Sequence, residues 1–527
     1  MLKKSVIFTL GLIAAASLVI WQVQDRRALQ RGAELSALYC SSCHVETSPD
    51  ILPKRSWAAA LGYMGYWLGI ENIDYLDDEP EFVRSNVGGR LEVLERDEVF
   101  PAAPLLSDED WALLRRYYMR RAPSDPIPQS GKPEMNWNLE RFETIRTSYR
   151  QPLAITTLVH VREPFQEVYV GDSLAQSLTV IDGGNGQVRA SRQFRPAISP
   201  VDIEFVGDTA FLGSIGDLLA QREASARLAH ISALTLVNDS IADATSEVVF
   251  EDLFRVADIE VADLNDDGRL DFIVCGFGSI TGSVSWFESL EDGDYMEHVL
   301  LPLPGAVKAR THDFTGDGLL DIMVLVSDAR EGLHILVNQG GGGFELQTIF
   351  ETHSAYGHTF LELHDFNGDG HMDALVVNGD NVDSDPYNTP KNYHGVRIYL
   401  NRGDLKFEEA WFYPMYGAFI AGAADFDADG DLDIAAISFY PDFTDPRRES
   451  FVYLENQGGL EFLPSSSLEL NNGRWMTMDI GDVDGDADVD VVLGGSYLEI
   501  GLFGDPEFYD ALVESGESVL ILKNTLN

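Results

Sequence analysis

Basic residues are scarce in this chain of 527 residues. Lys and Arg number 37 against 86 Asp and Glu, which gives a formal net charge of −49 at pH 7. A surface so short of positive charge disfavours nucleic acid and anionic lipid surfaces as partners. Apolar residues still make up 45% of the chain, enough to bury more than one core at this length. The sequence therefore predicts a multidomain globular protein with an acidic, solvated surface.

Long hydrophobic runs are also lacking, except at the N-terminus. Two lysines precede a largely apolar run from Val6 to Val23, and no clean small-residue cleavage site lies within it. Residues 1–23 are therefore predicted to be a targeting segment, and the chain to be exported. The run has about the shortest length that spans a bilayer, so an uncleaved anchor over residues 5–23 is favoured over a removed signal peptide. The expected location is the periplasm or the cell surface, with this segment as the only membrane contact.

Cysteine is rare as well, and two of the three cysteines stand in the string Cys40-Ser-Ser-Cys43-His44. Two thiols at this spacing can form thioethers with the vinyl groups of a haem, while the adjacent histidine ligates the iron. Export agrees with this interpretation, because c-type haem is attached outside the bacterial cytoplasm. A thioredoxin-like dithiol would need a surrounding βαβ unit, which the sequence lacks. A redox or structural disulfide and a chance match are the remaining alternatives, and the string predicts one covalent haem c.

The flanks of this string resemble class I cytochrome c. A helical stretch with Gly32 and Leu35 precedes the string, and the segment Ser107–Tyr118 resembles the closing helix of that family, with Ser107 as its N-cap. The resemblance implies a small all-α monohaem domain over residues 24–125.

The sixth iron ligand has two candidates in this domain. Met64 is flanked by Gly62 and Gly65, which let the backbone approach a porphyrin ring. It is preferred over Met119, which lies in the predicted closing helix. Ordinary core packing is the alternative role for Met64, because its neighbours are aromatic and apolar. A methionine ligand raises the reduction potential and suits electron transfer, whereas an open iron site would suit ligand chemistry.

Residues 126–149 are predicted to be a linker, because four prolines lie between Pro123 and Pro133. Proline-rich segments of this kind are extended and semi-rigid. The sequence thus separates the haem domain from the remaining chain, residues 150–527, where strand and turn patterns dominate.

Acidic loops recur through that remaining chain. The string Asp365-Phe-Asn-Gly-Asp-Gly-His-Met-Asp373 places oxygen-bearing side chains at positions 1, 3, 5 and 9, with glycine at position 6. Such oxygens can converge on a hard cation, and calcium, which takes about six to eight oxygen ligands, is the natural guest. The pattern occurs five times, so up to five calcium ions are expected. The predicted ligands are Asp263, Asn265, Asp267 and Asp271; Asp313, Thr315, Asp317 and Asp321; Asp365, Asn367, Asp369 and Asp373; Asp425, Asp427, Asp429 and Asp433; and Asp482, Asp484, Asp486 and Asp490.

The spacing of the loops indicates the fold. Successive loops begin 50 to 60 residues apart, and each runs into an apolar, strand-like segment. An EF-hand would continue as a helix after a glutamate at position 12, so that motif is excluded. Periods near 50 residues with several strands per repeat predict propeller blades. Two similar units without the loop, near residues 158–171 and 201–213, bring the expected number of blades to seven.

These repeats resemble the FG-GAP/VCBS family, whose calcium-loop units also build the head of integrin α-subunits. Turns of the form Asn-x-Gly followed by an aromatic residue, at Asn338, Asn401 and Asn456, fit the outer strands of that family. The resemblance implies an all-β seven-bladed propeller with structural ions, but not a particular activity. Thr315 at position 3 and Ala487 at position 6 depart from the pattern and predict weaker binding in the second and fifth loops.

The central channel is a candidate ligand site. The strand before each loop is predicted to be the innermost one, with alternate residues facing the channel. Oppositely charged residues there would form a polarised funnel for a small zwitterion, anion or sugar, and a water-filled channel with ion pairs is the alternative. The residues concerned are Asp258, Glu260, Lys308, Arg310, His358, Glu362, Trp475 and Asp479.

Three functions remain open at this point. The first is an exported electron-transfer protein whose haem exchanges one electron with a redox partner while the propeller serves as a docking or ligand-binding scaffold. The second is an integrin-like binding or adhesion module in which the haem senses redox state or a gas. The third is an oxidoreductase with its substrate in the channel. No nucleophile–base set, quinone-cofactor signature or second haem motif supports the third.

Overall fold

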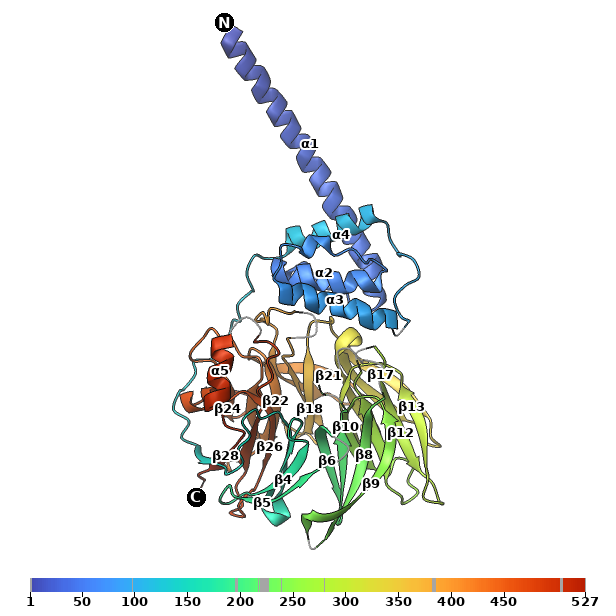
Figure 1. Ribbon diagram of the computed structural model, residues 1–527, viewed down its shortest axis with the longest axis vertical. Helices are drawn as coiled ribbons and strands as arrows, with labels where there is room; N and C mark the ends of the chain where they lie inside the picture. The colour runs from blue at the N-terminus through green and yellow to red at the C-terminus, as the bar shows by residue number, and fades with distance from the viewer. Residues whose placement is uncertain are drawn as a thin grey trace. The chain divides into compact units, whose positions relative to one another are not determined.

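The structure is a computed structural model of the chain, shown in Figure 1. It describes residues 2–96, 98–194, 198–216, 218, 227–237, 239–278, 280–381, 385–502 and 506–526, and their side chains from residue 17 onward except at 329 and 515. The chain divides into two compact units, Met1–Ile127 and Pro128–Asn527.

The first unit is helical. Ser107 caps its last helix, because its Oγ accepts a hydrogen bond from the backbone N–H of Asp110 at 3.2 Å, as predicted. Gly32 lies where the first and last helices pack together, since a Cβ there would come within 2.5 Å of the carbonyl oxygen of Leu113. The helices are α1 (Leu2–Tyr39), α2 (Lys54–Trp67), α3 (Glu81–Arg96) and α4 (Asp108–Arg121), with short 3-10 turns η1 (Cys40–Ser42), η2 (Pro49–Ile51) and η3 (Asp74–Leu76).

The membrane anchor predicted over residues 5–23 falls largely on residues whose side chains lie outside the described part of the chain. Within the described part, no helix has the length and apolar character needed to cross a membrane. The anchor therefore stays a prediction.

The second unit consists of seven four-stranded antiparallel sheets. In chain order, the first three comprise β2 (Thr156–Arg162), β3 (Glu167–Asp172), β4 (Ser177–Asp182) and β5 (Val188–Gln193); β6 (Pro200–Val206), β7 (Thr209–Ser214), β8 (Ala229–Val237) and β9 (Ser240–Leu253); and β10 (Val256–Ala262), β11 (Asp271–Gly276), β12 (Ser283–Ser289) and β13 (Tyr295–Leu301). The next three comprise β14 (Ala306–His312), β15 (Asp321–Val326), β16 (Gly332–Asn338) and β17 (Phe344–Glu351); β18 (His358–His364), β19 (Asp373–Asn378), β20 (Gly395–Asn401) and β21 (Phe407–Pro414); and β22 (Ala418–Ala424), β23 (Asp433–Ser438), β24 (Phe451–Asn456) and β25 (Phe462–Ser465). The seventh comprises β26 (Trp475–Gly481), β27 (Asp490–Gly495), β28 (Val519–Asn524) and β1 (Phe142–Arg146), with helix α5 (Pro506–Ser515) between β27 and β28.

The sheets are the blades of a closed propeller. The first strands of successive blades, β2, β6, β10, β14, β18, β22 and β26, lie next to one another, and β26 returns to β2. They are the innermost strands, which confirms the prediction that the strand before each acidic loop faces the centre. The seven-bladed count, including two blades without a loop, is also confirmed.

The second strand of each blade explains the apolar runs that follow the loops. In β11, β15, β19, β23 and β27 every residue is buried. These strands are covered on both faces by neighbouring blades, as the hydrophobic clusters that join successive blades show. A short continuous apolar run is the sequence pattern of a strand buried on both faces.

The predicted linker over residues 126–149 is only partly a linker. Its strand β1 pairs with β28, with Phe142 opposite Asn524 and Arg146 opposite Leu520. Further upstream, the Gln129 side chain donates to the carbonyl oxygen of His394 at 2.9 Å. The propeller unit therefore begins near residue 128 rather than at 150. The prolines that predicted a linker all precede β1, which adds a fourth strand to the edge of the seventh sheet.

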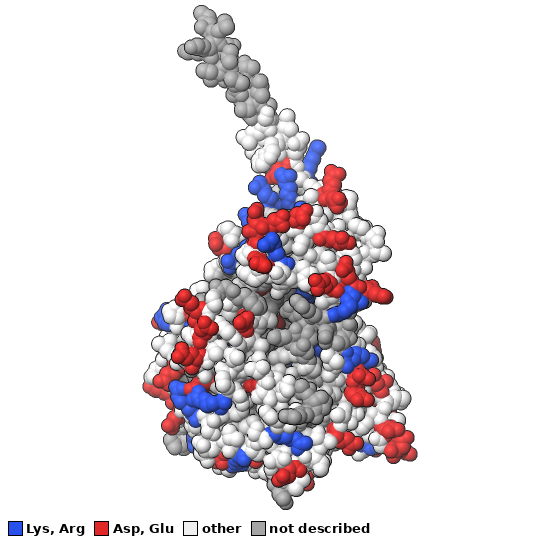
Figure 2. All heavy atoms as spheres, viewed as in Figure 1, with Lys and Arg blue, Asp and Glu red and all other residues white. Residues whose placement is uncertain are grey.

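Charged residues do not form one single-sign patch on the face shown in Figure 2. Acidic and basic side chains are interspersed there over the described residues.

Candidate metal loops and haem attachment motif

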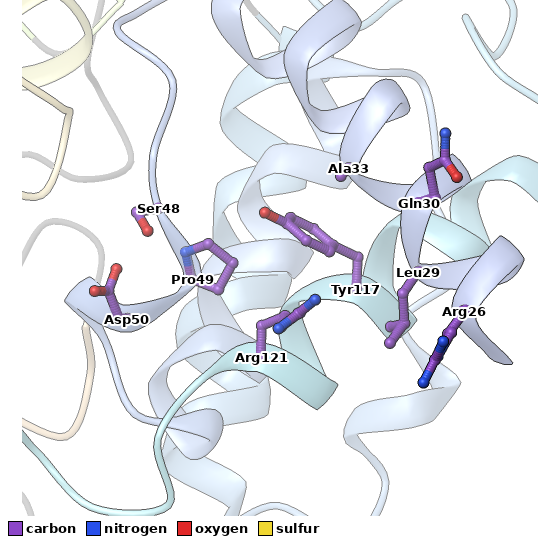
Figure 3. A pocket seen from close by; sticks show the side chains of 9 residues that line it. All are labelled: Arg26, Leu29, Gln30, Ala33, Ser48, Pro49, Asp50, Tyr117 and Arg121. Atoms are coloured by element: carbon purple, nitrogen blue, oxygen red, sulfur yellow. The ribbon is translucent and has the colours of Figure 1, made fainter. Parts of the chain in front are cut away.

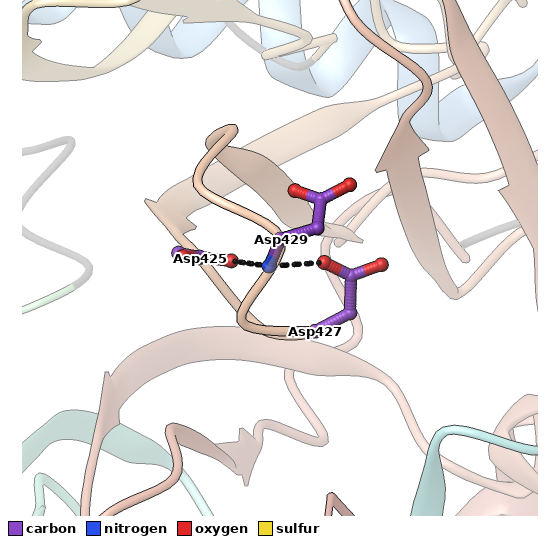
Figure 4. A group of neighbouring side chains, drawn as sticks. All are labelled: Asp425, Asp427 and Asp429. Carbon is purple, nitrogen blue, oxygen red and sulfur yellow. Dashed lines mark hydrogen bonds between the residues drawn. The ribbon is translucent and has the colours of Figure 1, made fainter.

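Each acidic loop is closed by hydrogen bonds from its own backbone to its first carboxylate. In the fourth loop, Asp425 accepts from the N–H groups of Asp429 and Gly430, both at 3.0 Å. Asp427 accepts from the same Asp429 N–H at 3.2 Å, as Figure 4 shows. Side-chain oxygens of Asp425, Asp427 and Asp429 all lie within 4.8 Å of one another. The loop thus gathers carboxylates at a separation suited to one bound cation.

The same turn recurs in the other loops. The N–H of Gly268, Gly318 and Gly370 at position 6 donates to the first carboxylate of its loop at 2.8 Å. All three glycines have positive φ, which explains the preference for glycine at this position. In the fifth loop, oxygens of Asp482, Asp484 and Asp490 converge within 4.8 Å.

The aspartate at position 9 is buried in every loop and joins the loop to the blade. Asp433 accepts from the N–H of Phe426 at 3.2 Å inside the loop and from the N–H of Asn456, in the third strand, at 2.7 Å. Burial raises the pKa of Asp433 and Asp373 to about 6 and that of Asp490 to about 7. A bound cation would favour the ionised form of these carboxyls. The five residues at this position are Asp271, Asp321, Asp373, Asp433 and Asp490.

Asparagines that end the third strands fasten the loops further, and sequence reasoning missed this role. The side chain of Asn338 donates to the carbonyl oxygens of Leu264 and Leu320, at 2.9 and 3.0 Å, so it holds loops of two adjacent blades. The side chain of Asn524 likewise donates to the carbonyl oxygens of Phe426 and Val489, which lie in the fourth and fifth loops. The recurrent Asn-x-Gly string includes three of these asparagines, but it predicted a turn at each and not a side chain that fastens the loop.

The Cys-x-x-Cys-His string lies at the end of α1. Cys40 begins η1 and is buried, which raises the pKa of its thiol, whereas Cys43 is exposed. The Nδ1 atom of His44 lies 2.7 Å from the carbonyl oxygen of Val45. That contact fixes the ring and leaves Nε2 for a metal, the usual arrangement of a ligating histidine. The donor set therefore fits a covalently attached haem c.

Both candidate sixth ligands contact the core of the helical unit. Met64 in α2 and Met119 in α4 are partly buried and pack against the apolar cluster that includes Cys40. The glycines beside Met64 serve helix packing here, because a Cβ on Gly62 would meet Val87 of α3 at 2.7 Å and one on Gly65 would meet Trp111 of α4 at 3.0 Å. The preference for Met64 stays a prediction.

A surface pocket of about 590 Å³ lies elsewhere on the helical unit (Figure 3). The Tyr117 ring extends across it between α1 and η2, with Pro49 opposite. Arg26 and Arg121 also line it, and Asp50 supplies an acidic group. None of the predicted haem-binding residues lines this pocket.

Charged residues of the inner strands form ion pairs with one another in the propeller, which was the alternative to a ligand funnel. Lys308 pairs with Asp258 at 2.5 Å, and Arg310 lies 3.5 Å from Asp258 and 3.4 Å from Glu260. The carboxylates also tie neighbouring inner strands together, since Asp258 accepts from the N–H of Ala309 at 2.8 Å. Much of the predicted funnel is thus engaged in joining blades.

His358 and Trp475 do not belong to this charged group, contrary to the prediction. His358 is 2% exposed and pairs with Glu331 at 3.0 Å, and Trp475 is 1% exposed and donates to the carbonyl oxygen of Leu470. The register of every inner strand shifts after its first residue, for example between His358 and Phe360. This β-bulge reverses the alternation, so the first residue faces the opposite side from the third and fifth.

Two acidic residues of the second blade were missed because that blade has no metal loop from which to count. Asp202 and Glu204 lie on β6 at the strand positions of Asp258 and Glu260. Burial and the neighbouring carboxylates raise the pKa of Glu204 to about 8, and burial raises that of Asp479 on β26 to about 7. Glu362 and Asp479 also accept backbone hydrogen bonds from the next blade.

We expect Glu204 to make the propeller less stable as the pH rises. Its folded-state pKa of about 8 lies above its ordinary value of 4.5, so the folded state binds this proton more tightly than the unfolded state. Stability from this group is therefore lost between about pH 5 and pH 8. Glu204→Gln, which cannot ionise, should exceed the wild type by roughly 1–3 kcal/mol at high pH and by little at pH 5.

Urea unfolding of the full chain at saturating calcium, followed across this pH range, measures the effect of Glu204→Gln. Glu247→Gln is the matched control, because Glu247 is an exposed glutamate on β9 of the same blade. Equal pH slopes for the wild type and Glu204→Gln would contradict the prediction.

Comparisons with known proteins agree with the fold. Residues 263–324 and 313–376 match the FG-GAP-like repeat, so the chain contains FG-GAP-like repeats within a seven-bladed β-propeller. No curated protein matches the chain.

Several solved structures share similarity at low sequence identity. A crystal structure of BBS1N in complex with ARL6DN is 12% identical, with a TM-score of 0.42, and the match covers 73% of this chain and 99% of that one. A crystal structure of an ancestral GH74 enzyme is 11% identical, with a TM-score of 0.46, and the match covers 77% of this chain and 52% of that one. A complex of S. cerevisiae dbp5 with nup159 and gle1 is 9% identical, with a TM-score of 0.39, over 76% of this chain and 97% of that one.

Proposed function

We propose that this is an exported, membrane-tethered haem c protein that transfers single electrons, with a calcium-stabilised propeller as its docking or ligand-binding scaffold. A propeller of FG-GAP-like repeats fits a binding or scaffold role. The observation that carries the redox half is the Cys40-to-His44 string at the end of α1, with His44 Nδ1 held by a carbonyl oxygen. A haem bound there would supply reversible one-electron chemistry at its iron.

The helical unit provides residues that would attach the haem and ligate its iron. Cys40 and Cys43 would hold the haem covalently, and His44 would present Nε2 to it in a fixed orientation. Tyr118 stabilises the region of the motif, because its hydroxyl lies 2.7 Å from Ser36 Oγ and donates to the carbonyl oxygen of Thr47 at 3.0 Å. The motif is therefore tied to α1 and α4.

The propeller supplies the calcium half of the proposal. Backbone N–H groups orient the carboxylates at positions 1 and 3, and position 9 is anchored to the third strand. Carboxylates held this close repel one another in the absence of a countercharge. Calcium, a hard cation that prefers oxygen ligands, would remove that repulsion and fix the turn between two strands.

Redox titration of the haem-loaded full chain tests the electron-transfer role. We expect one reversible one-electron transition, with a methionine-to-iron charge-transfer band in the oxidised spectrum that Met64→Ala abolishes. Met119→Ala is the matched control and should retain the band. A high-spin, gas-binding haem in the wild type would favour the sensor function instead, and loss of the band only in Met119→Ala would reassign the ligand.

A further inference from the structure

The fifth acidic loop differs from the others because a lysine reaches into it. Lys523, on β28, pairs with Asp484 and lies 3.2 Å from Asp486. These two aspartates occupy positions 3 and 5, where cation ligands are expected. The Asp484 side chain is 10% exposed, and those of Lys523 and Asp486 are 30% and 39% exposed, so only the Asp484 carboxylate lies mostly out of solvent.

In the described part of the chain, no other loop has a cationic side chain that pairs with two of its ligand positions. Arg269 pairs with Asp267 in the first loop, and Arg141 lies 3.7 Å from Asp427 in the fourth. Each of these arginines contacts one carboxylate only. A lysine ammonium is also a compact point charge, closer in shape to a metal ion than a planar guanidinium is.

The fifth loop keeps the same turn although alanine replaces glycine at position 6. Ala487 at position 6 has a φ of +72°, compared with +85° for Gly370 and +98° for Gly430 at the same position. Its N–H still donates to Asp482, at 3.0 Å. A side chain with a Cβ is strained in this left-handed region, so other contacts must compensate for the strain.

We propose that the Lys523 ammonium group takes the place of the divalent cation in the fifth loop, so that the protein binds four calcium ions and not five. This inference rests on the proposed calcium role of the other loops. Lys523 belongs to the seventh blade, in which β28 pairs with β1 and β27. The blade that closes the ring therefore carries its own countercharge and holds its loop at low calcium concentrations.

Counting bound calcium on the full chain, by native mass spectrometry and by equilibrium dialysis with radioactive calcium, tests the proposal. We expect four ions in the wild type and five in Lys523→Met, which removes the charge and keeps the apolar stem. Lys406→Met is the matched control, because Lys406 forms an exposed ion pair with Asp404 outside the five loops. It should bind four.

The outcomes separate this inference from the proposed function. Five ions in the wild type, or four in Lys523→Met, would overturn the role of Lys523 and leave the calcium proposal intact. No calcium in any of the three proteins would overturn the calcium proposal itself and this inference with it.

Hydrogen exchange of the wild type provides a second test that requires no variant. On chelation, amides of the first four loops should exchange faster, whereas those of residues 485–488 should be unchanged. Equal loss of protection in all five loops would overturn the inference.

Discussion

Removing calcium is expected to lower the melting temperature of the propeller by about 10 °C or more. Binding at one site stabilises the folded state by about 2.7 kcal/mol when free calcium is 100 times the dissociation constant. Four such sites would supply roughly 11 kcal/mol, comparable to the whole stability of a typical domain. The physical reason is that each loop gathers carboxylates within a few ångströms, as at Asp425, Asp427 and Asp429.

The measurement is the thermal unfolding of β-structure, followed by circular dichroism with and without a calcium chelator. Chelator already saturated with calcium is the control for other effects of the reagent, and added calcium should restore the original curve. An unchanged melting curve after chelation would show that the loops are stable without ions.

Replacing Cys40 and Cys43 together by alanine is expected to abolish covalent haem completely. The thioethers are the only covalent attachment that the chain can offer at this motif, and a haem held by His44 alone would be lost on denaturation. The protein is matured in a host competent for cytochrome c assembly, and the mass of the denatured chain is compared with that of the apoprotein. We expect one haem in the wild type and none in the double variant.

Cys275→Ala is the matched control for this experiment. Cys275 is a cysteine like the other two, but it lies fully buried in β11 of the propeller. This variant should carry one haem. A wild-type chain with no added haem mass would refute the redox half of the proposed function, and a haem that depends on Cys275 would assign the attachment elsewhere.

The repeat pattern was enough to predict the propeller because it combines two independent regularities. Loops at a period of 50 to 60 residues give the blades, and apolar runs after each loop give strands buried on both faces. The capping of α4 by Ser107 was predictable for a similar reason, since the interaction is local. Local interactions and strict periodicity can both be recognised from the amino-acid sequence alone.

What the sequence could not show depends on contacts between distant residues. The pairing of β1 with β28 joins positions 142 and 524, and no local pattern marks either as the partner of the other. The bulge that turns His358 away from Phe360 breaks a strict alternation that was assumed for the whole strand. Lys523 is unremarkable in sequence, and its role emerges only because the loop lies beside β28.

The pairing of β1 with β28 also determines how the protein responds to a cut. A protease that cleaves an exposed turn, such as residues 291–294 between β12 and β13, would leave two fragments, each still embedded in the ring. Both would migrate together under native conditions and separate only when denatured. The seventh blade, which contains strands from both ends of this unit, therefore holds the ring closed. Cleavage at a single outer turn leaves the two fragments associated.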